Sequence, residues 1–285
     1  MKKIAWLFVI LLSLLSCKQN KKDTAAYISV SIEPQRYFAE KIVGDKFKVK
    51  TIVSNGGSPE YFDPTPAQIV DFGKSKAYFM VGLFPFEKDL STTLKENDKS
   101  ILLINCSKGM TVKTLEEDHD NDSPHSGQDP HVWCSPQKAA EMSKNIYEGM
   151  VKLDPSNKAF YEKNYNALLD DIRTTDSLIK QSLSKVEVRE FIIFHPALTY
   201  FAEEYGLKQY AIEHEGKSPS PVFMSELVNT AKKRGIKIIF IQPEYDKKNA
   251  ENIAKEIDGR VVAINPLAYD WKDEMLKIAN NLKTQ

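Results

Sequence analysis

The chain has 285 residues, 42% of them hydrophobic, and its 39 Lys and Arg residues are balanced by 39 Asp and Glu residues. A formal net charge of zero gives no electrostatic case for binding nucleic acid, so we expect no nucleic-acid partner. The hydrophobic content is that of a globular protein, and the length allows one large domain or two modest ones.

The N-terminus has the pattern of a bacterial export signal. Two lysines precede an apolar stretch over residues 4–15, which is too short to span a bilayer. Small Ser16 precedes Cys17, an arrangement that resembles the lipobox, where the cysteine is lipidated and becomes the new N-terminus. We expect a lipoprotein signal peptide over residues 1–16 and a lipid anchor on Cys17; an ordinary secretory signal with an incidental cysteine is the alternative.

A polar segment follows this cysteine. Residues 17–26 have no hydrophobic periodicity and are expected to form a flexible tether between the lipid and the folded protein. No later run of the sequence is long and apolar enough to span a membrane. The sequence leaves open whether Cys106 and Cys134 form a disulfide or remain isolated buried thiols.

After the tether, short apolar runs alternate with amphipathic stretches, a pattern typical of βαβ units and parallel sheets. The first lobe is expected over residues 27–153. Its predicted strands are residues 27–32, 47–53, 77–81 and 100–105. Its predicted helices are residues 37–43, 66–75, 86–95 and 136–153.

Residues 114–128 interrupt this rhythm. They are rich in acidic residues and have no apolar face, so we expect a solvated loop. The loop also carries His119 and His125. Two interpretations remain open, a plain acidic surface insertion or a weak trap for cations.

A long helix is expected in the middle of the chain. Asp154 and Pro155 are typical of a helix N-cap and a first helical position, and no Gly or Pro follows before about Ser184. A helix of this length is unusual in a globular protein. We therefore expect residues 154–185 to link two lobes.

The alternation then resumes and predicts a second lobe over residues 186–285. Its predicted strands are residues 190–194, 207–212, 236–241 and 261–264. Its predicted helices are residues 197–205, 225–234, 249–257 and 273–282. The predicted fold class is α/β, with two lobes built on parallel sheets and joined by one long backbone helix.

Several polar side chains follow predicted strands. Glu60 and His195 follow strands in different lobes, and Glu244 and Asn265 follow two later strands. Ligand groups collect beyond the carboxyl ends of parallel strands, so these side chains can share one cleft if the two sheets point toward each other. Residues 213–215 could also approach the cleft, but we expect a solvated loop there.

His131 is a further candidate. Pro130 and Trp133 flank it closely and limit its mobility, and Asp129 or a backbone carbonyl could orient its ring. Two imidazoles and the carboxylate of Glu60 suit a borderline divalent ion such as zinc. Taken singly, a histidine is more often a hydrogen-bonded structural residue, and a glutamate is more often a surface acid.

Four segments, in order, resemble the metal-binding receptors of bacterial zinc and manganese ABC transporters, the cluster A-I type. They are GSPEYFDPTP at residues 57–66, DPHVW at 129–133, HPALTYF with YGL at 195–207, and NPL at 265–267. The resemblance covers the chain after the tether. It implies two α/β lobes joined by a long helix, with a metal ion held between them.

The sequence departs from this family's pattern at two positions. Glu60 stands where histidine is usual, and Asn265 stands where many members have aspartate. Both substitutions keep an oxygen available. The implied ligands are Glu60, His131 and His195, with Asn265, Glu244 or water completing the set.

The implied ion is Zn²⁺, with Mn²⁺ or Fe²⁺ as alternatives. His195 resembles the zinc receptors, since manganese receptors tend to have glutamate at its position, and the loop with His119 and His125 also favours zinc. Glu60 is a harder ligand and favours manganese or iron.

The resemblance implies a binding protein and not an enzyme. It would be a lipid-anchored, monomeric receptor outside the cytoplasm that delivers its ion to an ABC permease driven by an ATPase, and the long helix would restrict closure of the lobes. One alternative is a metal-dependent hydrolase, because two histidines, a glutamate and an open water position also describe catalytic zinc. Against it, the sequence has no His-Glu-x-x-His helix, and only Glu244 offers a general base. A receptor for a non-metal ligand is the other alternative.

Overall fold

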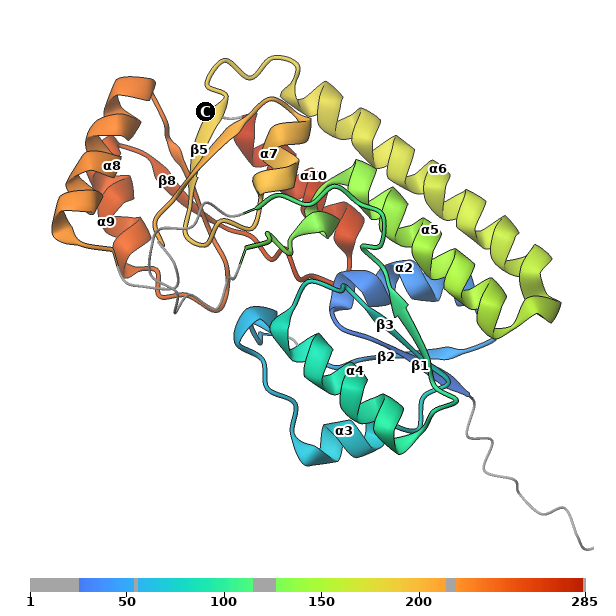
Figure 1. Cartoon of the computed structure of the whole chain (residues 1–285). Coiled ribbons are helices and arrows are strands. Elements are labelled where there is room, and N and C mark those ends of the chain that lie inside the picture. The colour runs from blue at the N-terminus through green and yellow to red at the C-terminus, as the bar shows by residue number, and fades with distance from the viewer. Residues whose placement is uncertain (1–25, 54–55, 115–126, 214–218, 284–285) are drawn as a thin grey trace, which may run out of the picture.

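The computed structural model describes residues 26–53, 56–114, 127–213 and 219–283. Within these ranges the chain forms two lobes connected along one side by long helices (Figure 1). Each lobe contains a four-stranded parallel sheet, which confirms the predicted fold class. The expected signal peptide, the lipidated cysteine, almost all of the tether and most of the acidic loop, including His119 and His125, lie outside the described residues.

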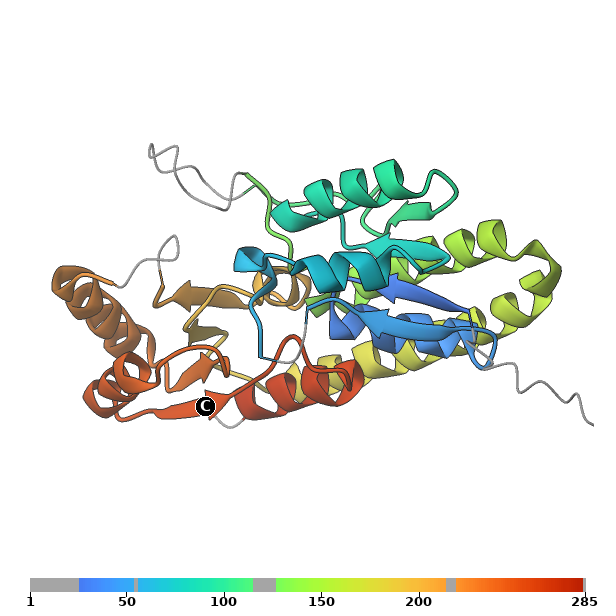
Figure 2. The same cartoon turned by 90° about the horizontal axis from the view of Figure 1, so that it is seen from below.

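The first lobe is built on a sheet with the strand order β2-β1-β3-β4. Helices α3 and α4 cover one face of this sheet. Helix α2 lies on the other face together with the long helix α5 (Pro136–Leu153) (Figure 2). The strands are β1 (Tyr27–Val30), β2 (Lys48–Thr51), β3 (Ala77–Met80) and β4 (Leu102–Asn105). The helices are α2 (Glu33–Val43), α3 (Pro66–Phe72) and α4 (Pro85–Asn97).

The second lobe repeats this topology with the strand order β6-β5-β7-β8. Helices α8 and α9 pack on one face of the sheet, where their apolar side chains form a separate core cluster. The strands are β5 (Glu190–Ile193), β6 (Lys208–Ala211), β7 (Ile238–Ile241) and β8 (Arg260–Ala263). The helices are α7 (Thr199–Glu204), α8 (Pro221–Arg234), α9 (Lys248–Ile257) and α10 (Trp271–Leu282).

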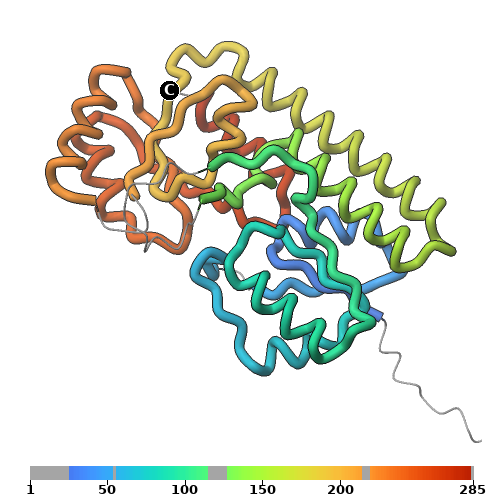
Figure 3. The backbone as a smooth tube through the Cα atoms, viewed as in Figure 1, coloured from blue at the N-terminus to red at the C-terminus, as the bar shows by residue number. Residues whose placement is uncertain are grey.

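Two long helices pack against each other and connect the lobes. Helix α5 (Pro136–Leu153) is followed by a 3₁₀ turn (Pro155–Asn157) and by α6 (Lys158–Leu183). At 1.5 Å per residue, the 26 residues of α6 are roughly 39 Å long, and Figure 3 shows this helix running from the far end of the first lobe to the second. The long helix expected here is therefore present, except that its first turn is 3₁₀.

The start of α2 was predicted wrongly, and one question that the sequence left open is answered. Helix α2 begins at Glu33, four residues earlier than predicted, because Pro34 lies in its first turn, where a missing N–H breaks no helical hydrogen bond. Cys106 and Cys134 are both buried free thiols, so the disulfide that the sequence left open does not form.

One core runs through both lobes. The inner face of the second sheet, together with α7 and α10, belongs to the same buried apolar cluster as the first lobe. Trp133 and Trp271 lie in this cluster: the Trp271 Nε1–H donates to the Trp133 carbonyl at 2.7 Å, and the Trp133 Nε1–H donates to the Pro266 carbonyl at 2.8 Å. Among the described helices, none combines the length and the apolar character needed to cross a membrane.

Candidate metal centre

Glu60, His131 and His195 converge between the lobes, although they lie far apart in the sequence. Glu60 lies in a 3₁₀ turn after β2, His131 immediately precedes another 3₁₀ turn, and His195 follows β5 after one residue. All three are buried, with exposed fractions of 8%, 6% and 5%. The predicted convergence of these three side chains is therefore confirmed, and each could offer one ligand atom to a shared ion.

The distances between the three donor atoms are suited to a small ion. Glu60 Oε1 lies 2.9 Å from His131 Nε2 and 2.9 Å from His195 Nε2, and the two Nε2 atoms are 3.3 Å apart. Two atoms bound to one tetrahedral zinc at about 2.0–2.1 Å are about 3.3 Å apart, so shifts of a few tenths of an ångström would accommodate it. The cavity that these side chains line has a volume of about 20 Å³, which is room for one water or a bare ion.

An outer carboxylate orients each imidazole. His131 Nδ1 lies 2.8 Å from Asp129 Oδ1, and the backbone N–H of His131 donates to the same oxygen at 2.9 Å. His195 Nδ1 lies 3.0 Å from Glu213 Oε2. With Nδ1 occupied in both rings, the two Nε2 atoms face the centre, which is the arrangement that metal-binding histidines usually have.

Asp129 was one of the partners expected for His131, but the expectation for Glu213 was wrong. Its side chain is buried against His195 instead of lying in a solvated loop. The reason is strand pairing: β6 lies beside β5, and the Glu213 N–H donates to the Phe194 carbonyl at 2.9 Å. Two strands that end together bring Glu213 to the residue that follows β5.

Gln242, which the sequence reasoning missed, holds the backbone of His195. Its Nε2–H donates to the His195 carbonyl at 2.7 Å, and its Oε1 accepts the His195 N–H at 3.3 Å. Tyr245 stacks on the His195 ring with centroids 5.7 Å apart, and Trp133 lies 5.3 Å from the His131 ring centroid. The available signal was a glutamine directly after the apolar strand β7, which pairs with β5.

The electrostatics of the centre favour proton binding when no metal is present. Burial alone would lower the pKa of His131, but hydrogen bonds to Asp129 and Glu60 outweigh it and raise the pKa to about 10. The pKa of His195 is raised in the same way, against burial, by Glu213 and Glu60. Burial acts to raise the pKa of Glu60, but hydrogen bonds to both histidines lower it below its usual range. A metal ion that binds His131 Nε2 must therefore displace a proton from this imidazole.

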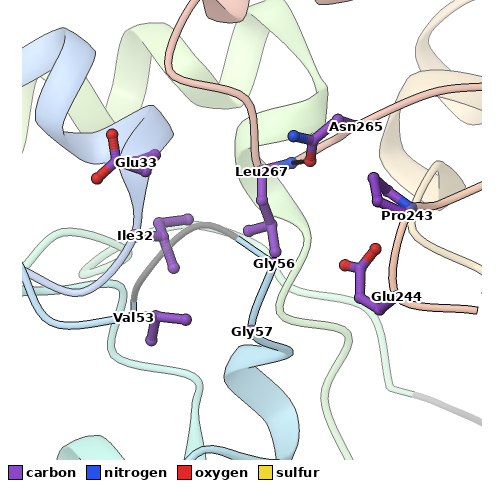
Figure 4. Close-up of a pocket in the computed structure, with 9 residues that line it drawn as sticks. All are labelled: Ile32, Glu33, Val53, Gly56, Gly57, Pro243, Glu244, Asn265 and Leu267. Carbon is purple, nitrogen blue, oxygen red and sulfur yellow. Dashed lines mark hydrogen bonds between the residues drawn. The ribbon is translucent and has the colours of Figure 1, made fainter.

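Asn265 occupies a different position from the three converging side chains. Its Oδ1 accepts the Leu267 N–H at 3.1 Å, and its backbone N–H donates to Glu274 Oε1 at 2.7 Å. It lines a neighbouring cavity (Figure 4), whereas Glu244 lines both that cavity and the one around the two histidines. The role of Asn265 as a metal ligand stays a prediction.

Two α/β lobes, a long connecting helix and a buried His/Glu centre between the lobes are the features expected of a metal-binding receptor. Residues 28–284 match the family described as zinc-uptake complex component A, periplasmic. The chain belongs to this family. Membership confirms the resemblance seen in the sequence and the expectation of a binding protein instead of an enzyme.

Known relatives agree with this assignment. The high-affinity zinc uptake system protein ZnuA of Bacillus subtilis (strain 168) is 30% identical over 272 residues, which cover 90% of this chain and 83% of ZnuA. The manganese ABC transporter substrate-binding lipoprotein PsaA of Streptococcus mitis is 25% identical over 284 residues, covering 92% of this chain and 89% of PsaA. A crystal structure of ZnuA superposes with a TM-score of 0.83 at 34% identity, covering 91% of this chain and 98% of that chain.

Proposed function

We propose that this protein binds one Zn²⁺ through Glu60, His131 and His195 and delivers it to an ABC permease. The observation that carries the proposal is the convergence of one carboxylate and two imidazoles, from both lobes, in a cavity with room for a single ion. Asp129 and Glu213 support it, because they hold Nδ1 of each imidazole, so that Nε2 is the nitrogen that faces the centre.

Zinc fits these side chains better than manganese or iron. Imidazole nitrogen suits a borderline ion, whereas manganese is usually held in octahedral sites rich in oxygen ligands. The small cavity and the short distances between donor atoms favour four-coordinate geometry. The ZnuA relative, named for zinc uptake, is also more similar to this chain than PsaA, which is named for manganese.

The proposed receptor works outside the cytoplasm as a lipid-anchored monomer. The support is the export-signal pattern in the sequence of residues 1–16, the cysteine that follows it, and a relative that is itself named a lipoprotein. The permease that receives the ion is driven by an ATPase.

In cells, Cys17→Ser should move the protein from the membrane fraction to the soluble fraction. Retention of this variant on the membrane would contradict a lipid anchor on Cys17.

Zinc titration of the metal-free protein tests the binding site. The wild-type chain should bind one Zn²⁺, and His195→Ala should weaken binding by at least about 100-fold, since loss of a ligand exceeds the 10–100-fold typical of losing an outer-shell partner. Glu226→Gln, an exposed change on α8, is the control and should bind like the wild type. Absence of zinc binding by the wild type, or unchanged affinity in His195→Ala, would overturn the proposal.

A further inference from the structure

A second cavity, of about 90 Å³, adjoins the proposed zinc site (Figure 4). Its wall includes Glu33, Glu244 and Asn265. Glu244 and Leu267 line both this cavity and the smaller one that contains the two histidines. Glu244 is therefore the carboxylate that borders both spaces within the described part of the chain.

The oxygen atoms in this wall differ in whether they have partners. Glu33 accepts a hydrogen bond from Arg36 Nε at 2.9 Å. The Asn265 amide oxygen accepts the Leu267 N–H, and Figure 4 shows this amide turned back toward the chain. Glu244 Oε2, in contrast, is buried and has no hydrogen-bond partner within the described ranges. A buried carboxylate oxygen without a partner is destabilising unless an ion or water binds it.

The three proposed ligands leave one position of a tetrahedral zinc ion open. Glu244 follows β7, which pairs with the strand that leads to His195, so both side chains start from the same edge of the second sheet. In Figure 4 its carboxylate points into the space enclosed by the labelled residues. We infer that Glu244, and not Asn265, is the fourth protein ligand of the bound ion. This inference rests on the proposed zinc-binding function.

The first test of this inference is to replace the Glu244 carboxylate and measure the affinity for zinc. Zinc affinity of the metal-free full-length chain is measured by competition with a chromophoric chelator at fixed pH. Glu244→Gln removes the anionic oxygen with little change in shape and should weaken binding by about 10–100-fold, while Glu244→His, which restores a ligand of similar reach, should bind within about tenfold of the wild type. Glu33→Gln removes a carboxylate from the wall of the neighbouring cavity. Its zinc affinity should stay within about twofold of the wild type, because Glu33 Oε2 accepts a hydrogen bond from Arg36.

Counting imidazoles on the bound ion provides a second, independent readout. X-ray absorption at the zinc edge should report two imidazoles in the wild type, three in Glu244→His and two in Asn265→His. Glu244→Gln binding within about threefold of the wild type, or two imidazoles in Glu244→His, would overturn the inference. Either of these two results would reject Glu244 as a ligand without contradicting the proposed zinc binding by Glu60, His131 and His195. A wild-type chain that binds no zinc would contradict the proposed function itself.

Discussion

The two histidines of the centre are each fixed at both ring nitrogens. Nδ1 of His131 and of His195 faces Asp129 and Glu213, and Nε2 of both rings faces Glu60. The rings are thus oriented before any ion arrives. An ion binding here does not have to select the correct ring orientation, which is an entropic advantage for affinity.

Glu213 should contribute to zinc affinity without touching the ion. Glu213→Gln replaces the carboxylate that accepts from His195 Nδ1 by a weaker neutral acceptor, so Nε2 becomes a poorer ligand. We expect zinc affinity to fall by about tenfold, less than for His195→Ala. Chelator competition measures it, and equal affinity of Glu213→Gln and wild type would show that Glu213 has no influence on His195.

Zinc affinity should rise with pH. The pKa of His131 is raised to about 10, so this imidazole carries a proton near neutral pH and must lose it to bind zinc. Raising the pH lowers the cost of that loss, and lowering the pH increases it. Titrations at pH values of about 6, 7 and 8 should show tighter binding at each step, with proton release seen as a buffer-dependent binding enthalpy. The same affinity at all three values would contradict proton displacement.

At the scale of elements, the carboxyl ends of neighbouring parallel strands create the site. The segments after β5, β6 and β7 bring His195, Glu213 and Gln242 together, and the loop after β2 adds Glu60 from the other lobe. Strand pairing within the second lobe brings His195, Glu213 and Gln242 together. Packing of the two lobes against each other then places Glu60 beside them.

The sequence predicted the three central side chains and Asp129 as a partner of His131, but it did not predict the roles of Glu213 and Gln242. Glu60, His131 and His195 could be found because each belongs to a recognisable motif or directly follows an apolar run. Glu213 begins a short polar stretch that locally has the character of a solvated loop, and Gln242 has no motif of its own. Their roles depend on which strands are neighbours, and the local pattern does not contain that information. The start of α2 was missed because a proline near a helix N-terminus resembles a strand terminator.

A buried glutamate stabilises the end of β3. Glu87, in the first turn of α4, is 2% exposed, and its carboxylate accepts the backbone N–H groups of Val81 at 2.6 Å and Gly82 at 2.7 Å, as well as the hydroxyl of Ser31. A glutamine would turn an N–H₂ group toward some of these donors. We expect Glu87→Gln to lower the free energy of unfolding by about 2–4 kcal/mol.

Urea unfolding of the metal-free protein measures this effect. Glu96→Gln, an exposed change near the end of the same helix, is the matched control and should change stability by less than about 0.5 kcal/mol. Equal midpoints for Glu87→Gln and the control would contradict the role given to this carboxylate.

At the scale of the whole molecule, the lobes are packed as one body. The Trp133 Nε1–H donates to Pro266 and the Trp271 Nε1–H donates back to Trp133, inside the apolar cluster that both lobes share. On the surface, Tyr269 donates to Glu40 Oε2 at 2.6 Å and lies under the Arg36 guanidinium. A wide hinge opening would break all of these contacts and expose the shared core.

Zinc binding should therefore leave the overall shape nearly unchanged. Small-angle scattering of the metal-free and zinc-loaded protein should give radii of gyration within about 0.5 Å of each other, with local loop movement accounting for entry and release. A clear compaction on adding zinc would show that the shared core opens and that the lobes close by a hinge motion.

In the proposed site, one carboxylate and two imidazoles hold a single zinc ion between the lobes. The decisive measurement is anomalous diffraction at the zinc absorption edge from a crystal of the zinc-loaded protein. One anomalous peak should lie about 2.0–2.2 Å from His131 Nε2, His195 Nε2 and Glu60 Oε1. A fully loaded crystal with its peak bound to other side chains, and none at these three atoms, would contradict the claim.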